Sequence, residues 1–237
     1  MRLTDSPLIL ALDVSSTREA ALLCEQVGDA VSVAKVGLEL FIAEGPQCVT
    51  AIRNTGRSIF IDLKLHDIPE TVDRAVARAA ALGASMLTVH AAGGSAMLER
   101  AVARASREAT GLAIVAVTVL TSHTSASLEE TGVAASLDKQ VQTLAQLAWK
   151  AGVTHFVCSP NEASSLRTLF GQDACLITPG VRSEAGAHHD QARVLTAAEA
   201  IRAGANWLVV GRPIRDAIDP RAAAVALARE AREAKQQ

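Results

Sequence analysis

The stretch Ile59 to Thr71, IFIDLKLHDIPET, places charged side chains inside a run that otherwise has the composition of a buried strand. Successive side chains of a strand point to opposite faces, so Asp62 and Lys64 are expected side by side on one face. The other face carries the apolar side chains Ile59, Ile61, Leu63 and Leu65. Pro69 suits the first turn of a helix. The stretch therefore predicts a strand that ends in charged residues and leads into a helix.

Asp67 follows just past the end of this predicted strand and completes an Asp-x-Lys-x-x-Asp array. Such an array would hold two anions around one ammonium, an arrangement that sets the charge state of a lysine for proton transfer. A second interpretation is structural. In it, Asp62 and Lys64 form an internal salt bridge and Asp67 caps the following helix.

Eight short apolar segments recur along the chain, and each is followed by a segment with helical spacing of apolar residues. The predicted strands are Leu8–Val14, Val33–Glu39, Ile59–Leu65, Met86–His90, Ala113–Leu120, His155–Ser159, Ala174–Pro179 and Trp207–Val210. The predicted helices are Thr17–Val27, Gln47–Arg53, Glu70–Leu82, Ala96–Glu108, Asp138–Lys150, Glu162–Thr168, Ala197–Arg202 and Pro220–Lys235.

Eight strand–helix units without a Pro-rich or Ser-rich linker predict a (β/α)8 TIM barrel, and we expect residues 1–237 to form one domain. A doubly wound open sheet is the alternative. In a barrel, functional residues collect at the carboxyl ends of the strands. Fold class alone therefore indicates where the site should lie.

Composition argues against several classes of function. The formal net charge is −2, aromatic residues make up 3% and tyrosine is absent, so neither a basic stripe nor a set of stacking platforms for nucleic acid is present. The apolar runs are too short to span a bilayer, and the N-terminal run lacks the pattern of a signal peptide. We expect a cytoplasmic protein. Its four cysteines are scattered, which predicts buried free thiols.

Polar residues collect at the predicted strand ends. Asp13 closes the first strand, Lys35 and Glu39 lie in the second, His90 ends the fourth, and Thr121 with Ser122 follow the fifth. The seventh strand runs into Pro179-Gly180-Val181-Arg182 and the eighth into Gly211-Arg212-Pro213. A glycine with exposed backbone N–H groups beside an arginine suits phosphate oxygens, and the loops after the last two strands of a barrel often bind phosphate. A phosphorylated substrate is implied.

Taken together, these motifs resemble orotidine 5′-phosphate decarboxylases of the bacterial type. The resemblance rests on Asp62-Leu63-Lys64-Leu65-His66-Asp67-Ile68-Pro69, Ala11-Leu12-Asp13, Lys35-Val36-Gly37, Pro179-Gly180-Val181-Arg182 and Gly211-Arg212-Pro213-Ile214. It covers essentially the whole chain, with the motifs in the expected order. One departure is Glu70, where many bacterial members carry Asn.

The resemblance implies a carboxy-lyase that converts orotidine 5′-phosphate to uridine 5′-phosphate and CO2 in pyrimidine biosynthesis, with no cofactor and no metal. Lys64 would donate a proton to C6 of the pyrimidine, and Asp62 would face the substrate carboxylate. Lys35 and Lys64 would stabilise the developing carbanion. Asp67 and Thr71 would reach into the partner's site in a homodimer, and neither nucleic acid nor membrane is an expected partner.

The resemblance also assigns the binding groups. Asp13 would bind the ribose hydroxyls, with Lys35 beside it, and Thr121 or Ser122 would contact the pyrimidine. Arg182, Gln191, Gly211 and Arg212 would hold the phosphate, and Pro179 is a further implied substrate-binding residue. Gln191 lies in Ser183–Arg193, a polar loop that could close over the substrate.

Two alternatives remain open. Mg²⁺-dependent barrels acting on sugar phosphates, such as hexulose-phosphate synthase and ketogulonate-phosphate decarboxylase, share the Asp-x-Lys-x-x-Asp strand. The resemblance to them would require a metal-binding Glu two positions before Asp62, where this chain has Phe60, which cannot ligate Mg²⁺. The other alternative is a non-catalytic barrel that binds nucleotides or partners. It is disfavoured because Lys35, Asp62, Lys64 and Asp67 are all present.

Overall fold

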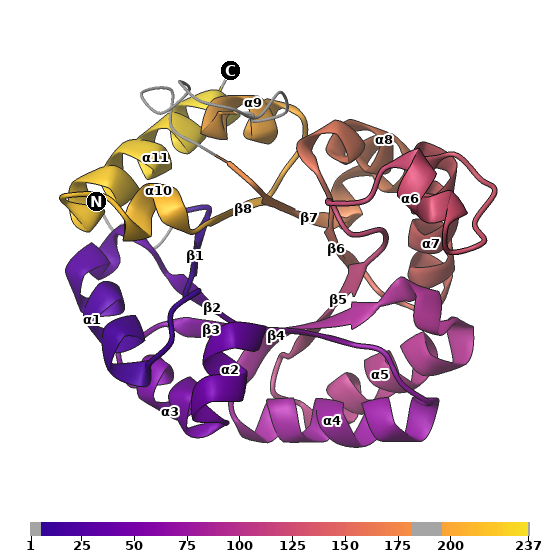
Figure 1. The fold of residues 1–237 in the computed structure, drawn as a ribbon, viewed down its shortest axis with the longest axis horizontal. Helices are drawn as coiled ribbons and strands as arrows, with labels where there is room; N and C mark the ends of the chain where they lie inside the picture. Colours follow the sequence, from indigo (N-terminus) through magenta and orange to yellow (C-terminus); the bar gives the residue numbers. More distant parts are fainter. Residues whose placement is uncertain (1–5, 182–195, 237) are drawn as a thin grey trace.

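The computed structural model describes residues 6–181 and 196–236. Eight parallel strands, each paired with its neighbours in sequence, close into a barrel in which β8 pairs with β1 (Figure 1). The strands are β1 (Leu8–Ala11), β2 (Val33–Gly37), β3 (Ser58–Leu65), β4 (Ala84–His90), β5 (Ala113–Val117), β6 (His155–Val157), β7 (Cys175–Pro179) and β8 (Trp207–Val210). The predicted (β/α)8 fold is confirmed, and the open sheet is wrong.

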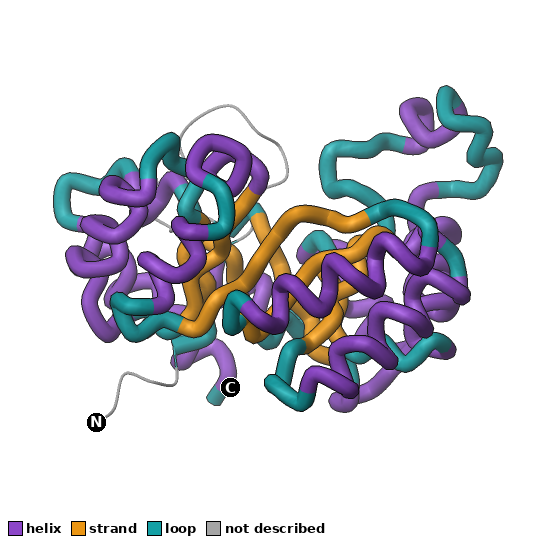
Figure 2. The backbone as a smooth tube through the Cα atoms, turned by 90° about the horizontal axis from the view of Figure 1, so that it is seen from below, coloured by secondary structure: helices purple, strands orange, loops and turns teal. Residues whose placement is uncertain are grey.

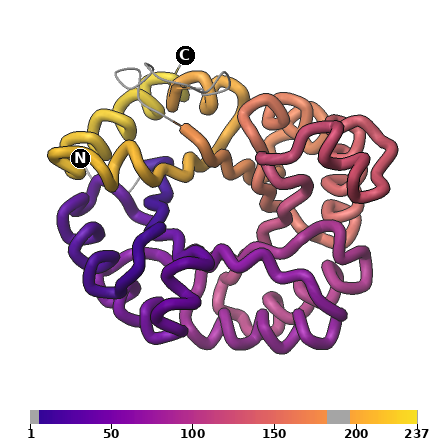
Figure 3. The backbone as a smooth tube through the Cα atoms, viewed as in Figure 1, coloured from indigo at the N-terminus to yellow at the C-terminus, as the bar shows by residue number. Residues whose placement is uncertain are grey.

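Helices surround the barrel and cover the outer face of its strands (Figures 1 and 3). The α-helices are α1 (Thr17–Val27), α2 (Leu38–Glu44), α3 (Gln47–Arg53), α4 (Pro69–Ala81), α5 (Ser95–Glu108), α6 (Ser125–Glu129), α7 (Leu137–Lys150), α8 (Pro160–Phe170), α9 (Ala197–Arg202), α10 (Arg212–Arg215) and α11 (Pro220–Lys235). Short 3-10 turns are η2 (Gly28–Ala30), η3 (Ala91–Gly93) and η4 (Gly171–Asp173). All eight predicted helices are confirmed to within a few residues, because each has an apolar stripe that packs on the barrel.

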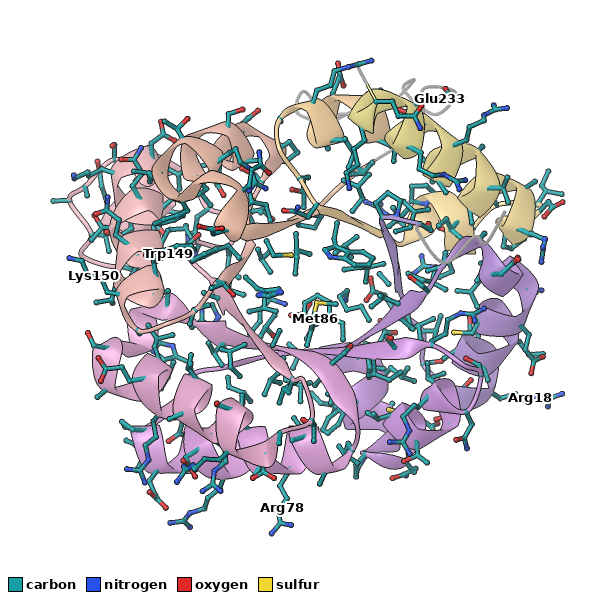
Figure 4. The ribbon with its side chains drawn as sticks, turned by 180° about the vertical axis from the view of Figure 1, so that it is seen from behind. Arg18, Arg78, Met86, Trp149, Lys150 and Glu233 are labelled. Carbon is teal, nitrogen blue, oxygen red and sulfur yellow. The ribbon has the colours of Figure 1, made fainter. Side chains whose placement is uncertain are left out.

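Both faces of the strands are apolar over most of their length, as expected for a parallel sheet covered by helices. The larger cluster fills the space between strands and helices. A smaller one fills the interior of the barrel, where Met86 lies near the axis (Figure 4). The buried residues of this inner cluster are Ile9, Val33, Phe60, Met86, Val115 and Ile177. Residues two and four positions further along these strands therefore face the mouth of the barrel.

Several strands end earlier than predicted. Glu39, predicted in the second strand, lies instead in the first turn of α2, and β5 ends at Val117 rather than Leu120. The hydrogen-bond pairing between strands explains why β2 ends early, since the last residue pair between β2 and β3 is Gly37 with Asp62. Residues beyond the rim have no strand partner, and the segment after Gly37 forms a helix.

The connection between β5 and α7, which carries α6, projects from one end of the barrel (Figure 2). The helices α2, α6 and α10 were not predicted, because each is only one to two turns long and α2 begins within the apolar run that was assigned to the second strand. Within residues 6–181 and 196–236, no helix is long and apolar enough to cross a membrane. The four cysteines are free thiols, three of them buried and Cys175 partly exposed, which largely confirms the prediction.

Candidate active site

Four charged side chains meet at the carboxyl ends of β1, β2 and β3. Lys35 Nζ lies 3.2 Å from Asp13 Oδ1 and 3.5 Å from Asp62 Oδ2. Lys64 Nζ lies 2.9 Å from Asp62 Oδ1. The charges thus alternate along one chain of contacts, Asp13, Lys35, Asp62 and Lys64, and the two carboxylates balance the two ammonium groups. We call these four residues the charge network.

The charge network fits tightly against the backbone on one side. A Cβ atom at Gly37 would lie only 3.1 Å from Lys35 Nζ and 3.4 Å from Asp13 Oδ1. Gly211, at the end of β8, also lies beside Asp13, since a Cβ atom there would be 3.6 Å from Asp13 Oδ2. The closed barrel therefore brings the ends of its first and last strands to the same group of charges.

Asp62 is the most enclosed carboxylate of the charge network, with 14% of its side chain exposed. Burial disfavours its ionised form, but the two lysines and hydrogen bonds from Lys64 and Thr88 outweigh burial, and the pKa of Asp62 is lowered. Asp62 is thus an anion at neutral pH, positioned between two cations.

Lys64 has an unusual backbone conformation, with φ at +51°. This left-handed region costs a residue other than glycine about 1–2 kcal/mol. The pairing of β3 with β4 shifts register between Ile61 and Leu65, so Lys64 lies in a bulge of the strand. Its backbone N–H donates to Thr88 Oγ1 at 2.8 Å, and the Thr88 hydroxyl donates to Asp62 Oδ1 at 3.0 Å.

Asp67 does not join the charge network within this chain. Its side chain accepts a hydrogen bond from the backbone N–H of Ile68 at 2.7 Å, and the residue is exposed. Among the described residues, Asp62 is the only carboxylate paired with Lys64. The expectation of two anions around this ammonium is therefore wrong within one chain. Helix capping by Asp67 is also wrong, because Ile68 is the N-cap of α4 and has no side-chain cap bond.

Two histidines flank the lysine side of the charge network. The rings of His66 and His90 lie 5.5 Å apart. Burial, followed by the proximity of His66 and Lys64, lowers the pKa of His90, which is therefore neutral at pH 7. A neutral His90 therefore adds no positive charge beside Lys64.

The remaining predicted site residues lie around the same rim. Thr121 and Ser122 are exposed in the turn after β5, Pro179 ends β7, and Thr71 is exposed in the first turn of α4. Arg212 begins α10 next to Gly211 and is exposed; it forms no salt bridge or hydrogen bond among the described residues, although its charge helps to lower the pKa of Asp216. The predicted residues Arg182 and Gln191 lie outside the described residues.

Two residues of the site were missed by sequence reasoning. Thr88 shares the inward face of β4 with His90, so strand alternation applied to Leu87-Thr88-Val89 could have found it. Arg215 donates from Nη1 to the backbone carbonyl of Asp13 at 2.8 Å and pairs with Asp216. No local pattern indicates this contact, which joins residues at opposite ends of the sequence.

No group of three or more His, Cys, Asp or Glu side chains in residues 6–181 and 196–236 is arranged to hold a metal ion. The absence of a metal from the reaction stays a prediction. The geometry itself provides two carboxylates and two ammonium groups at the open end of a barrel, with Asp62 held between the two lysines. Such a site can repel one negative group of a ligand, stabilise negative charge that develops beside it, and deliver a proton from an ammonium.

Comparison with known proteins gives a consistent family assignment. Residues 6–227 match the model of the "Orotidine 5'-phosphate decarboxylase / HUMPS family". The orotidine 5′-phosphate decarboxylase of Anaeromyxobacter sp. (strain K) is 50% identical over 218 residues, which cover 92% of this chain and 95% of that protein. The enzyme of the same name from Thermobifida fusca (strain YX) is 47% identical over 226 residues, 95% of each chain.

A solved structure agrees with these sequence matches. The crystal structure of orotidine 5′-phosphate decarboxylase from Lactobacillus acidophilus superimposes with a TM-score of 0.83 at 34% identity, covering 95% of this chain and 99% of the other. Both the fold and the sequence are thus shared over nearly the full length. The chain belongs to the orotidine 5′-phosphate decarboxylase / HUMPS family.

Proposed function

We propose that this protein is a carboxy-lyase that converts orotidine 5′-phosphate to uridine 5′-phosphate and CO2, a step of pyrimidine biosynthesis. Relatives that are 44–50% identical over most of the chain carry the name of this enzyme. The observation that carries the proposal is the ionised Asp62 held between Lys35 and Lys64 at the mouth of the barrel. This arrangement matches a reaction that removes a carboxylate and then protonates the carbon it leaves.

Lys64 is the proton donor in this proposal. The bond between C6 and the carboxylate carbon breaks, its electron pair stays on C6, and the Lys64 ammonium protonates that carbon. The lysine then regains a proton from water, to which it is open, since 31% of its side chain is exposed. In balance, orotidine 5′-phosphate and one proton give uridine 5′-phosphate and CO2. Positioned general acids of this kind contribute about 10²–10⁴-fold to a rate.

Asp62 and Lys35 supply the fixed charges around this step. Asp62, anionic because its pKa is lowered, would face the substrate carboxylate and repel it. Lys35 is almost fully buried and is held at 3.2 Å by Asp13 and at 3.5 Å by Asp62. Because the ammonium groups of Lys35 and Lys64 are already in place before the substrate binds, they would stabilise the carbanion without reorganising.

The barrel interior favours this reaction over Mg²⁺-dependent sugar-phosphate chemistry. Phe60 occupies the inward position two residues before Asp62, is 1% exposed and belongs to the inner apolar cluster. A metal site of the alternative kind would need a carboxylate there. We therefore propose that neither metal nor organic cofactor takes part. The non-catalytic barrel is disfavoured because such closely paired buried charges are costly to keep without a role.

The substrate phosphate would bind at the ends of β7 and β8. Arg212 is exposed and forms no salt bridge among the described residues, and Gly211 lies beside Asp13. The proposal assigns Asp13 to the ribose hydroxyls, and Thr121 or Ser122 to the pyrimidine. Arg182 and Gln191 complete the set around the phosphate, and Pro179 is a further substrate-binding residue in the proposal.

We propose a homodimer in which Asp67 and Thr71 reach into the partner's site. Both residues are exposed in this chain, and Ile68 between them has 66% of its surface exposed. On α2, Leu38 is 49% exposed and Ile42 is 77% exposed. Exposed apolar side chains such as these would be covered in a dimer if they lie within its interface. Mixing Lys64→Ala with Asp67→Ala subunits should restore activity that neither variant has alone; mixtures that stay inactive would contradict shared sites.

The small net charge and low aromatic content support a protein that acts on a small molecule rather than on nucleic acid or a membrane. A soluble enzyme of nucleotide metabolism fits the cytoplasm, which is the location we propose. The proposed substrate class and the proposed location thus rest on the composition of the chain and on the family to which it belongs.

The proposed reaction is tested by the loss of substrate absorbance when the purified protein is mixed with orotidine 5′-phosphate in excess EDTA. Undiminished turnover under these conditions, equal to that in added Mg²⁺, is the expected result. A protein that is folded yet inactive in EDTA, and regains activity with Mg²⁺, would point to the metal-dependent alternative. Inactivity under both conditions would favour a binding role.

A further inference from the structure

Thr88 connects the backbone of Lys64 to the carboxylate of Asp62 through a single hydroxyl group. It lies in β4, is fully buried, and follows Met86 by two positions on the inward face. Its Oγ1 lies 2.8 Å from Lys64 N and 3.0 Å from Asp62 Oδ1. A backbone N–H only donates and an ionised carboxylate only accepts. The hydroxyl proton therefore points to Asp62, and its lone pair to Lys64.

These bonds close a ring that begins and ends in Lys64. The ring runs from the Lys64 N–H to Thr88 Oγ1, on to Asp62 Oδ1, and back to Lys64 Nζ at 2.9 Å. Both ends of a lysine with four rotatable side-chain bonds are thus held by one carboxylate oxygen and one hydroxyl. We call this arrangement the Thr88 ring.

The Thr88 ring takes the place of ladder bonds that β3 and β4 do not make. Their pairing shifts register between Ile61 and Leu65, and Lys64 in this bulge has φ at +51°. A left-handed conformation at a residue other than glycine persists only where its surroundings hold it. The Thr88 hydroxyl accepts from the Lys64 N–H inside this bulge, so a valine at position 88 would remove that acceptor.

We propose that Thr88 is a positioning residue for the decarboxylation proposed above, on which this inference rests: its hydroxyl holds Lys64 in the left-handed conformation that keeps the ammonium on Asp62 and at the reacting carbon. Thr88 acts through Lys64 and Asp62 rather than on the substrate. Its loss should therefore lower the rate of the proton-transfer step while leaving substrate binding almost unchanged.

The test compares Thr88→Val, which keeps the shape but removes the hydroxyl, with Thr88→Ser, which keeps the hydroxyl. Thr88→Val should lower kcat by about 10- to 100-fold, the effect of one hydrogen bond to a charged group, with KM within about threefold. Thr88→Ser should stay within about threefold of the wild-type kcat. If Thr88→Val does not fold, Thr88→Ala against Thr88→Ser makes the same comparison.

Thr178→Val is a matched control. Thr178 is likewise a fully buried threonine within a barrel strand, but its hydroxyl has a single hydrogen-bond contact among the described residues, the weak one to Cys158 Sγ at 3.9 Å. This variant should keep the wild-type kcat and KM. A loss equal to that of Thr88→Val would show that any buried strand hydroxyl matters, and would overturn the specific role of Thr88.

Two further measurements separate positioning from simple packing. The Thr88 hydrogen bond is one of the contacts that lower the pKa of Asp62, together with Lys35 and Lys64, so Thr88→Val should move the acid limb of the kcat profile to higher pH. In a crystal structure of Thr88→Val, Lys64 should leave the left-handed region or lose its contact with Asp62. An unchanged Lys64, acid limb and kcat would overturn the proposal.

The crystallographic comparison does not depend on activity. If the wild-type protein fails to decarboxylate orotidine 5′-phosphate, the proposed function is wrong, but the structure of Thr88→Val still shows whether the hydroxyl holds Lys64. If the wild-type protein is active and Thr88→Val matches it, only the role of Thr88 is wrong.

Discussion

Replacing Asp62 with Asn should weaken both the fold and the reaction, because this substitution keeps the shape of the side chain and removes the charge that two lysines share. The amide oxygen can still accept from the Thr88 hydroxyl. What is lost is the ion pair with Lys64 at 2.9 Å and the ion pair with Lys35 at 3.5 Å. Lys35 is then left with Asp13 as its only anionic partner among the described residues.

The size of the effect follows from how exposed each lysine is. The Lys35 side chain is 11% exposed, so its lost contact should cost about 2 kcal/mol, as for a buried hydrogen bond to a charged group. The Lys64 side chain is 31% exposed, and solvent screening reduces its share to about 1 kcal/mol. The sum, about 3 kcal/mol, corresponds to a Tm lower by roughly 6–12 °C for a protein of this length.

Thermal and urea unfolding followed by circular dichroism measure this change, and steady-state decarboxylation should show kcat lower by at least about a hundredfold. Asp173→Asn is the control, because Asp173 is exposed and forms no ion pair with any other described residue. A loss of less than about 1 kcal/mol in Asp62→Asn, the scale of a surface pair, would refute the reasoning that the charge network is held together by this carboxylate.

Two further predictions concern the phosphate end of the site and the response to acid. Arg212→Ala should weaken the binding of uridine 5′-phosphate about tenfold or more while leaving uridine binding unchanged, as titration calorimetry would show; equal losses would indicate a structural arginine. Asp73 is buried between α4 and α5, where Arg100, Arg104 and Arg107 bind its carboxylate. These contacts lower the pKa of Asp73, and the hydrogen bond from Arg104 has the largest effect. The stabilising contribution of Asp73 is thus complete at neutral pH and lost as pH falls below about 4, so urea unfolding of Asp73→Asn should differ from wild type strongly at pH 7 and less at pH 3.

Much of the fold could be predicted because its elements are defined by patterns within short segments. The helix Thr17–Val27 and the strand Trp207–Val210 have the predicted bounds, since the helix has one apolar stripe and the strand is a short apolar run that packs on both of its faces. The ends of β2 and β5 could not be predicted in this way. They depend on where the neighbouring strand stops pairing, and this information lies far away in the sequence.

The same distinction applies to the site. Alternation along β3 predicts that Asp62 and Lys64 share a face, and their 2.9 Å contact confirms it. Alternation alone does not predict the left-handed conformation of Lys64, because that conformation depends on a hydroxyl from β4. Nor does it show that Asp67 binds its own neighbour's N–H instead of the charge network, since the bulge redirects the chain after the lysine.

The central claim, that Lys64 delivers the proton to C6, is tested most directly by a single-turnover measurement on Lys64→Ala. Excess enzyme is mixed with orotidine 5′-phosphate, uridine 5′-phosphate is quantified, and its binding is measured separately by calorimetry. We predict that conversion is abolished while the fold and nucleotide binding are largely retained. Conversion at a rate near that of the wild-type protein would contradict the claim and remove Lys64 from the role of proton donor.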